Sequence, residues 1–185
     1  MQKRVLVVLA DGFEEIEAIS PIDVLRRAGA SVTVASLEDK KASVRGTHDV
    51  WFSCDACLSD VEKERFDAII FPGGMPGAKN LSESELVRKL ILETYARGDF
   101  VCAICASPAF VLAPTGILDG KKVTCYPGCE AVAPNVSFGK YRAVKDGNVI
   151  TSAGPGTALE FGLLIAESLL GKEVSDKLHL GMICK

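Results

Sequence analysis

Residues 4–12 read Arg-Val-Leu-Val-Val-Leu-Ala-Asp-Gly, an apolar run that stops abruptly at an acid and a glycine. A short apolar run of this kind is typical of a β-strand that is covered on both faces. Residues 14–28 then show a helical pattern, with acids at the start, arginines at the end and Gly29 as a stop signal. Residues 31–36 alternate and contain β-branched side chains, which predicts a second strand. Together these segments predict a strand–helix–strand unit.

The same alternation of buried strands and helices continues along the chain. Further strands are predicted at 66–71, 100–104, 122–126 and 148–152. Further helices are predicted at 82–98, 108–113 and 157–170, the first of them opened by a capping box of Ser82 and Glu85. This alternation predicts one α/β domain, residues 1–185, around a mainly parallel sheet. Two segments are less regular: Pro21 predicts a kink or break in the first helix, and residues 42–45 and 49–53 form short strands or a hairpin.

The composition is that of a globular protein, with 48% apolar and 24% charged residues among 185. This balance excludes a mostly disordered chain, a coiled coil and a collagen-like chain. The net charge is −3 and no basic block stands out, so the sequence has no nucleic-acid or membrane-surface signature. The apolar run at the N-terminus is too short to span a bilayer and lacks a cleavage region, so we expect a cytoplasmic protein.

Seven cysteines are the unusual feature of the composition. Structural disulfides are rare in a reducing cytoplasm, so the odd number does not imply a missing partner. Cys54 and Cys57, and likewise Cys102 and Cys105, have the spacing of zinc ligands. Residues 100–106 have the pattern of a buried strand, however, on which positions i and i+3 point to opposite faces. We therefore expect no metal and no cofactor, and we place Cys102 in the core.

The functional site of such a sheet lies beyond the carboxyl ends of its strands. The loops expected there cover residues 11–17, 72–78, 105–108 and 154–157. Gly73 and Gly74 follow a strand but lack the pattern of a nucleotide-binding loop. Their N–H groups suit either an anion nest or oxyanion hole, or simply a turn that reverses the chain.

Cys105 follows a predicted strand where a helix begins, which is the position of a nucleophile elbow. The N-terminal dipole of that helix favours the thiolate, although position alone equally fits a buried, inert cysteine. His48 and His179 lie outside the expected site loops, and we interpret both as surface or packing residues. The other candidate partners for a reactive thiol are the carboxylates of the first strand–helix loop, Glu14, Glu15 and Glu17.

Six segments, in order along nearly the whole chain, carry a resemblance to a known family. They are ADGFEEIE at 10–17, PIDVLRRAG at 21–29, FPGG at 71–74, NLSES at 80–84, AICASP at 103–108 and TSAGPGT at 151–157. Each segment is weak alone, but together they are specific. The chain resembles the DJ-1/ThiJ/PfpI superfamily, and within it the DJ-1-like branch.

The resemblance implies a flavodoxin-like three-layer sandwich that is usually a homodimer. It implies that Cys105 is the reactive cysteine and that Glu17 is a protonated acid hydrogen-bonded to its sulfur. The backbone amides of Gly73, Gly74 and Ala106 are implied to bind an oxyanion or a sulfinate. Members are described as glyoxalase III-type enzymes that form lactate from methylglyoxal without glutathione, as deglycases, and as oxidative-stress sensors or chaperones.

The sequence departs from the family near this site. Tyr126 stands where many relatives have a histidine, a change that shifts weight from turnover toward oxidation sensing. Ser107 replaces a glycine or alanine, and Ala153 replaces an arginine or glutamine. Peptidase and amidotransferase relatives have a histidine directly after the nucleophile, so Ala106 argues against those activities. The candidates for the pocket are Tyr126, Ser107, Gly154 and Pro155.

Three functions are compatible with these residues. The leading hypothesis is an enzyme that uses Cys105 and Glu17 on 2-oxoaldehydes such as methylglyoxal or on glycated substrates. The rival is an oxidative-stress sensor or redox-regulated chaperone whose Cys105 is oxidised without significant turnover. The third is a catalytically empty binding module, because a fold does not fix a function.

Overall fold

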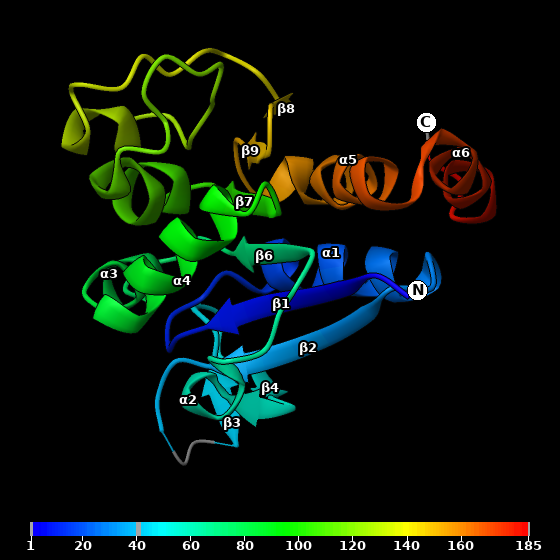
Figure 1. Cartoon of the computed structure of the whole chain (residues 1–185), viewed down its shortest axis with the longest axis horizontal. Coiled ribbons are helices and arrows are strands. Elements are labelled where there is room, and N and C mark those ends of the chain that lie inside the picture. The colour runs from blue at the N-terminus through cyan, green and yellow to red at the C-terminus, as the bar shows by residue number, and fades with distance from the viewer. Residues whose placement is uncertain (1, 40–41, 185) are drawn as a thin grey trace.

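The computed structural model describes residues 2–39 and 42–184, and its centre is a seven-stranded sheet in the order β5-β2-β1-β6-β7-β9-β8. The strands are β1 (Arg4–Leu9), β2 (Ser31–Ser36), β5 (Ala56–Cys57), β6 (Ala68–Phe71), β7 (Phe100–Ile104), β8 (Ala143–Asp146) and β9 (Val149–Ser152). Every pairing is parallel except that of β8 with β9. Strands β1, β2 and β6 run in the same direction side by side (Figure 1). The predicted mainly parallel sheet is confirmed.

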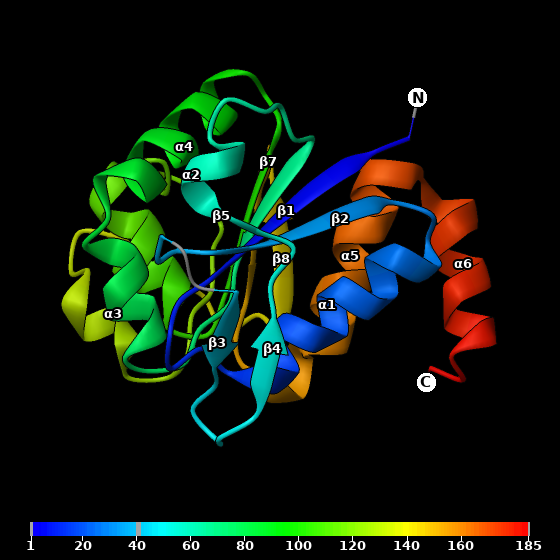
Figure 2. The same cartoon turned by 90° about the horizontal axis from the view of Figure 1, so that it is seen from below.

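Helices cover both faces of this sheet and make a three-layer sandwich. One face carries α1 (Glu15–Arg27), α5 (Ala158–Leu170) and α6 (Lys172–Gly181), and the other carries α2 (Leu58–Val61), α3 (Gly77–Ser82) and α4 (Glu85–Ala96) (Figure 2). The residues of β1 alternate between two cores, because successive side chains of a strand point to opposite faces. Val5, Val7 and Leu9 pack with the α1–α5 layer, whereas Leu6 and Val8 pack with the α4 layer. The fold is thus flavodoxin-like α/β.

The less regular segment between β2 and β5 contains an antiparallel hairpin. Its strands are β3 (Ser43–Arg45) and β4 (Trp51–Ser53), as the sequence predicted. The hairpin contacts the loop after β1, where the amide of Gly12 donates to Arg45 O at 2.8 Å and that of Thr47 donates to Phe13 O at 2.9 Å. These bonds fix the start of α1, which carries the acidic residues of the site.

Two local predictions about helices differ from the structure, a break at Pro21 and a cap at Ser82, and a third is confirmed in position. Helix α1 continues unbroken through Pro21, where Gly162 of α5 lets the two helices approach closely: a Cβ on that glycine would lie 3.0 Å from the Pro21 Cα. Helix α4 is capped by the hydroxyl of Ser84, which accepts from Val87 N, because Ser82 still belongs to α3. The short helix predicted at 108–113 is present as a π-helical turn, Pro108–Leu112, followed by a 3₁₀ turn, Ala113–Thr115.

Two further differences concern the C-terminal third. Residues 122–126 form no strand: Val123 makes one bridge to Phe138, and Thr124 N donates to the Thr151 hydroxyl instead of a neighbouring backbone. Helix α6 was not predicted, although its Val174 and Leu178 side chains pack against the core. Within the described ranges no helix has both the length and the apolar character needed to cross a membrane.

Candidate active site around Cys105

Cys105 lies immediately after β7, in a turn between the sheet and the π-helical turn Pro108–Leu112. Its φ of 64° is in the left-handed region, which is uncommon and costly for a residue with a side chain. The Cys105 amide donates to Ser152 O at 2.9 Å, so β9 holds the turn in place. The residue is only 9% exposed. The chain thus places a thiol at the carboxyl edge of the sheet in a strained, well-anchored turn.

Glu17, on the first turn of α1, is the acid that faces this thiol. It is completely buried, and its Oε2 accepts from Gly73 N at 2.9 Å. A side-chain hydrogen bond also joins it to Cys105. Burial raises the pKa of Glu17 to about 7, the hydrogen bond with Cys105 opposes that rise, and the charge of Glu14 adds to it. Oε1 has no hydrogen-bond partner in the described part of the chain.

The thiol of Cys105 also resists ionisation. Burial, followed by the charge and hydrogen bond of Glu17, raises the pKa of Cys105, whereas the amides of Gly74 and Ala106 lower it. This net direction contradicts the expected acidic thiol, and the five-residue turn after Cys105 is too short to supply a substantial helix dipole. Since each group is harder to ionise beside the charged form of the other, the pair retains one proton near neutral pH.

The two glycines after β6 allow the groups to meet. A Cβ on Gly73 would lie 2.7 Å from both the Cys105 Cβ and the Glu17 Oε2, so a side chain does not fit there. Gly74 has a φ of 87°, and its Cβ would lie 2.4 Å from Glu14 N. The Gly73 amide is used by Glu17, which differs from the expectation that it faces an anion with the other two donors. The amides directed at the sulfur are those of Gly74 and Ala106.

The other predicted pocket residues lie near Cys105 but in different roles. Ser107 is fully buried, and its hydroxyl donates to Pro72 O at 2.5 Å, so it ties two loops together rather than lining a pocket. Tyr126 is 48% exposed, and its amide donates to Cys105 O at 2.8 Å. Its ring lies against Gly154, because a Cβ there would be 3.1 Å from the Tyr126 Cδ2. Pro155 begins the 3₁₀ turn that leads into α5.

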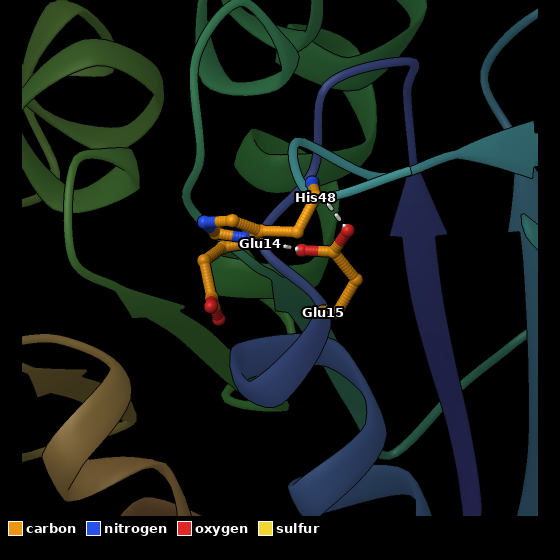
Figure 3. Close-up of side chains that lie close together, drawn as sticks. All are labelled: Glu14, Glu15 and His48. Atoms are coloured by element: carbon orange, nitrogen blue, oxygen red, sulfur yellow. Dashed lines mark hydrogen bonds and ion pairs between the residues drawn. The ribbon is translucent and has the colours of Figure 1, made fainter. Parts of the chain in front are cut away.

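Glu14 and Glu15 do not face the thiol. The Glu14 carboxylate caps α1 by accepting from Glu17 N at 2.8 Å, a positioning role that sequence reasoning missed. The Glu15 carboxylate points toward His48, whose ring Nδ1 lies 2.8 Å away and whose amide donates at 2.6 Å (Figure 3). His48 is exposed at the surface, as expected, but it is also an ion-pair partner. One ligand atom from each of these three residues lies within 4.8 Å of the others.

A mainly parallel sheet with an elbow cysteine that faces a buried acid and two backbone amides defines a class of flavodoxin-like α/β proteins with one candidate reactive thiol. The model of the DJ-1/PfpI family matches residues 3–168. The chain belongs to this family, in its DJ-1-like branch.

Individual relatives agree over nearly the whole length. The chain is 44% identical to Drosophila melanogaster protein dj-1beta over 185 residues, covering 99% of this chain and 98% of the relative. The crystal structure of that protein superposes with a TM-score of 0.95, covering 100% of both chains at 43% identity. Toxoplasma gondii DJ-1, solved in an oxidized form, gives a TM-score of 0.93 at 41% identity with 98% of each chain covered. A Caenorhabditis elegans relative, "Glutathione-independent glyoxalase DJR-1.2", is 39% identical over 185 residues, covering 96% of this chain and 94% of the relative.

Proposed function

We propose that the protein converts 2-oxoaldehydes such as methylglyoxal to 2-hydroxy acids without glutathione, or removes them from glycated substrates as a deglycase. The observation that carries this proposal is the hydrogen-bonded pair of Cys105 and Glu17, in which the carboxyl group has a pKa of about 7. An acid that titrates near the working pH can both give and take a proton. Conversion of a 2-oxoaldehyde to a 2-hydroxy acid requires both, because a proton must move between the two neighbouring carbons. The relative named as a glutathione-independent glyoxalase supports the same chemistry.

The reaction follows from where the shared proton lies. When Glu17 carries it, Cys105 is a thiolate that the amides of Gly74 and Ala106 stabilise. The thiolate adds to the aldehyde carbon, and Glu17 protonates the new alkoxide to give a hemithioacetal. The Glu17 carboxylate then removes the proton from that carbon and returns it to the neighbouring carbon, which turns the hemithioacetal into a thioester. Water hydrolyses the thioester to lactate and restores the Cys105 thiol.

The same groups support a second candidate, an oxidative-stress sensor or redox-regulated chaperone. The Gly74 and Ala106 amides that stabilise a thiolate also suit a sulfinate anion, which a protonated Glu17 can hydrogen-bond. That the Toxoplasma relative was solved in an oxidized form favours this alternative. Tyr126 in place of the histidine that many relatives carry also shifts weight toward this alternative.

Incubation with methylglyoxal in the absence of glutathione tests the enzymatic proposal. We expect loss of aldehyde matched by formation of lactate, and neither process in Cys105→Ala. Cys57→Ser is the matched control, because this half-buried thiol lies at the edge strand β5, far along the sheet order from β7. Lactate formation that Cys105→Ala retains, or its absence from the unmodified protein, contradicts the proposal and leaves oxidation as the function of the site.

We also propose a cytoplasmic homodimer, in keeping with the resemblance. Exposed apolar side chains lie on α1, β4 and α5, among them Ile16 at 54%, Trp51 at 61% and Leu159 at 40%. These elements meet, since α1 packs on α5 and the Glu15 carboxylate binds the hairpin. Light scattering should give twice the chain mass, and Trp51→Asp should lower it to the mass of one chain. A single-chain mass for the unmodified protein contradicts the dimer.

A further inference from the structure

Cys129 is held beside Cys105 by two successive backbone hydrogen bonds. The amide of Tyr126 donates to Cys105 O at 2.8 Å, and the amide of Cys129 donates to Tyr126 O at 2.9 Å. Cys129 also packs against both hydrophobic clusters, one of which contains Cys105. The 3₁₀ turn Cys129–Val132 contacts the π-helical turn that follows the elbow. A second, half-buried thiol therefore lies in the immediate surroundings of the candidate nucleophile.

The charge environment connects Cys129 to the same acid. Burial, then the charges of Glu130 and Glu17, raise the pKa of Cys129. This thiol is therefore protonated at neutral pH, and the Glu17 carboxylate is close enough to influence its ionisation. A protonated thiol needs a base before it can attack another sulfur, because the thiolate is the nucleophile. The nearby carboxylate can accept that proton.

The hydrogen bonds of the turn that carries Cys129 are local, although Ala133 and Val136 anchor the segment in the core. The amides of Ala133 and Val136 bond to Glu130 O and Ala133 O, and the Gly128 amide bonds to the Glu130 carboxylate, so these contacts are all local. A disulfide needs the two Cα atoms within about 7 Å of each other. Any shift that this requires falls on the short turn and breaks no hydrogen bond of the sheet, so its free-energy cost is small.

We propose that Cys129 is a resolving thiol that forms a reversible disulfide with Cys105 after peroxide oxidation. A peroxide first transfers one oxygen atom to the Cys105 thiolate, which gives a sulfenic acid and an alcohol or water. The Cys129 sulfur then attacks the Cys105 sulfur and displaces the hydroxyl group, which leaves as water with the proton from Cys129. The products are one Cys105–Cys129 disulfide and one water, and an external dithiol reduces the bond to the two starting thiols.

This inference rests on the proposed reactivity of Cys105 but on no aldehyde substrate. It adds a peroxide-reducing cycle in which one peroxide and one dithiol are consumed per turn. It also sets a limit on irreversible damage, since a sulfenic acid captured as a disulfide does not go on to the sulfinate.

The remaining cysteines are less suitable partners. Cys102 is fully buried inside β7, where a backbone shift would disturb pairing with both neighbouring strands. Cys125 is buried in the core cluster that does not contain Cys105, and the charge of Cys129 raises its pKa, so it is a neighbour of Cys129 and the competing partner for a disulfide. Cys54 and Cys57 flank the edge strand β5, which is separated from β7 by three strands. Cys184 follows α6 at the C-terminal end of the described chain, and no hydrogen bond among the described residues links its segment to the elbow. Cys129 is the thiol that a backbone hydrogen-bonded turn connects to Cys105 O.

Intact mass and non-reducing peptide mapping after one equivalent of hydrogen peroxide test the proposal. We expect the unmodified protein to lose two hydrogen atoms and to yield one cross-linked pair of peptides containing Cys105 and Cys129. Cys129→Ser should instead gain oxygen atoms on Cys105. Cys125→Ser, the control for a neighbouring thiol, should behave as the unmodified protein. Cys129→Ala serves as a second variant if the serine variant folds poorly.

Two results would overturn the inference. One is sulfinate formation on Cys105 to the same extent in the unmodified protein and in Cys129→Ser. The other is a cross-link between Cys125 and Cys129 that leaves Cys105 untouched. Both readouts are independent of lactate formation. If the protein forms the disulfide but shows no glyoxalase activity, the proposed enzymatic function is wrong and the resolving role of Cys129 stands. If the glyoxalase activity is present, dithiothreitol should restore it after peroxide in the unmodified protein but not in Cys129→Ser.

Discussion

Glu15 and Glu17 occupy the same helical turn of α1, and both are buried, but their side chains leave the helix toward different neighbours. Glu15 turns to the hairpin, where it accepts from the His48 amide at 2.6 Å and lies 2.8 Å from the His48 ring. Glu17 turns to the elbow, where it accepts from Gly73 N and leaves Oε1 without a hydrogen-bond partner among the described residues.

The number of hydrogen-bond donors around each carboxyl group decides whether Glu15 or Glu17 is ionised near neutral pH. Burial opposes ionisation at Glu15, but the hydrogen bonds from His48 outweigh it and lower the pKa of Glu15 below its ordinary value of 4.5. At Glu17 burial prevails and raises the pKa to about 7. One helix turn thus presents a structural carboxylate on one side and a proton-carrying acid on the other.

The largest expected difference between the two acids is in activity. Glu17→Gln keeps the shape of the side chain but removes its ability to carry a proton, so lactate formation should fall by about 10²-fold or more. Glu15→Gln is the matched control and should keep most of the activity. The comparison fails if the two variants lose similar amounts of activity in the methylglyoxal assay at equal folded fractions.

The second difference between Glu15 and Glu17 is in how the stability of the protein depends on pH. The folded protein keeps a proton on Glu17 between pH 4.5 and about 7 that the unfolded chain has lost, so stability falls as the pH rises through this window. The full penalty is on the order of 3 kcal/mol. Glu17→Gln should therefore be more stable than the unmodified protein at about pH 8 but not at about pH 4, as measured by urea unfolding. A difference that does not change with pH would contradict the raised pKa.

A methyl group added at Gly73 should have a smaller effect on stability than the ionisation of Glu17, and this effect is confined to the site around Cys105. Gly73→Ala places a methyl group 2.7 Å from the Cys105 Cβ and the Glu17 Oε2. We therefore expect the variant to lose about 1–3 kcal/mol of stability and to lose most of its activity. Gly156→Ala is the matched control, because its Cβ would meet nothing within 4 Å. Thermal unfolding of both variants measures the difference, and equal stabilities would show that the site is not tightly packed.

The smallest effect is expected on the hairpin side. Glu15 raises the pKa of the exposed His48 through a hydrogen bond and its charge, so the stabilisation is present below about pH 6.5 and is lost as the pH rises through the folded-state pKa. His48→Ala should slightly destabilise the protein at about pH 5 and leave its stability unchanged at about pH 9. A loss of the same size at both pH values would show that the imidazole acts through packing and not through charge.

The sequence predicted the sheet well because its strands have strong local patterns. β2 and β7 lie where alternation and apolar runs placed them, and the ends of β1, β6 and β9 differ by one or two residues. The edge strands β5 and β8 were not predicted. The failures have weak or misleading local signals. Ser82 resembles a cap, but the preceding residues already form α3. Helix α6 is mostly exposed and packs against the core through a few apolar side chains, such as Val174 and Leu178.

The site was predictable as a set of positions but not as a set of contacts. The resemblance singled out Glu17 among three nearby acids, and the structure brings this residue to Cys105. The pattern does not reveal that the Gly73 amide is occupied by Glu17 or that Ser107 bonds to Pro72, because both contacts join loops that are distant in sequence. Cys129 has no motif of its own, and only the turn that begins at Tyr126 places it near the elbow.

Titration of the glutamate carboxyl groups by carbon-13 NMR tests the central claim most directly, with Glu15→Gln and Glu17→Gln used to assign the two signals. We predict that the Glu17 carboxyl titrates near pH 7 and that its midpoint changes in Cys105→Ala, whereas the Glu15 carboxyl titrates below 4.5. If Glu17 is fully ionised at pH 5, its carboxyl group carries no proton at neutral pH, and the proposed acid–base role of Glu17 is wrong.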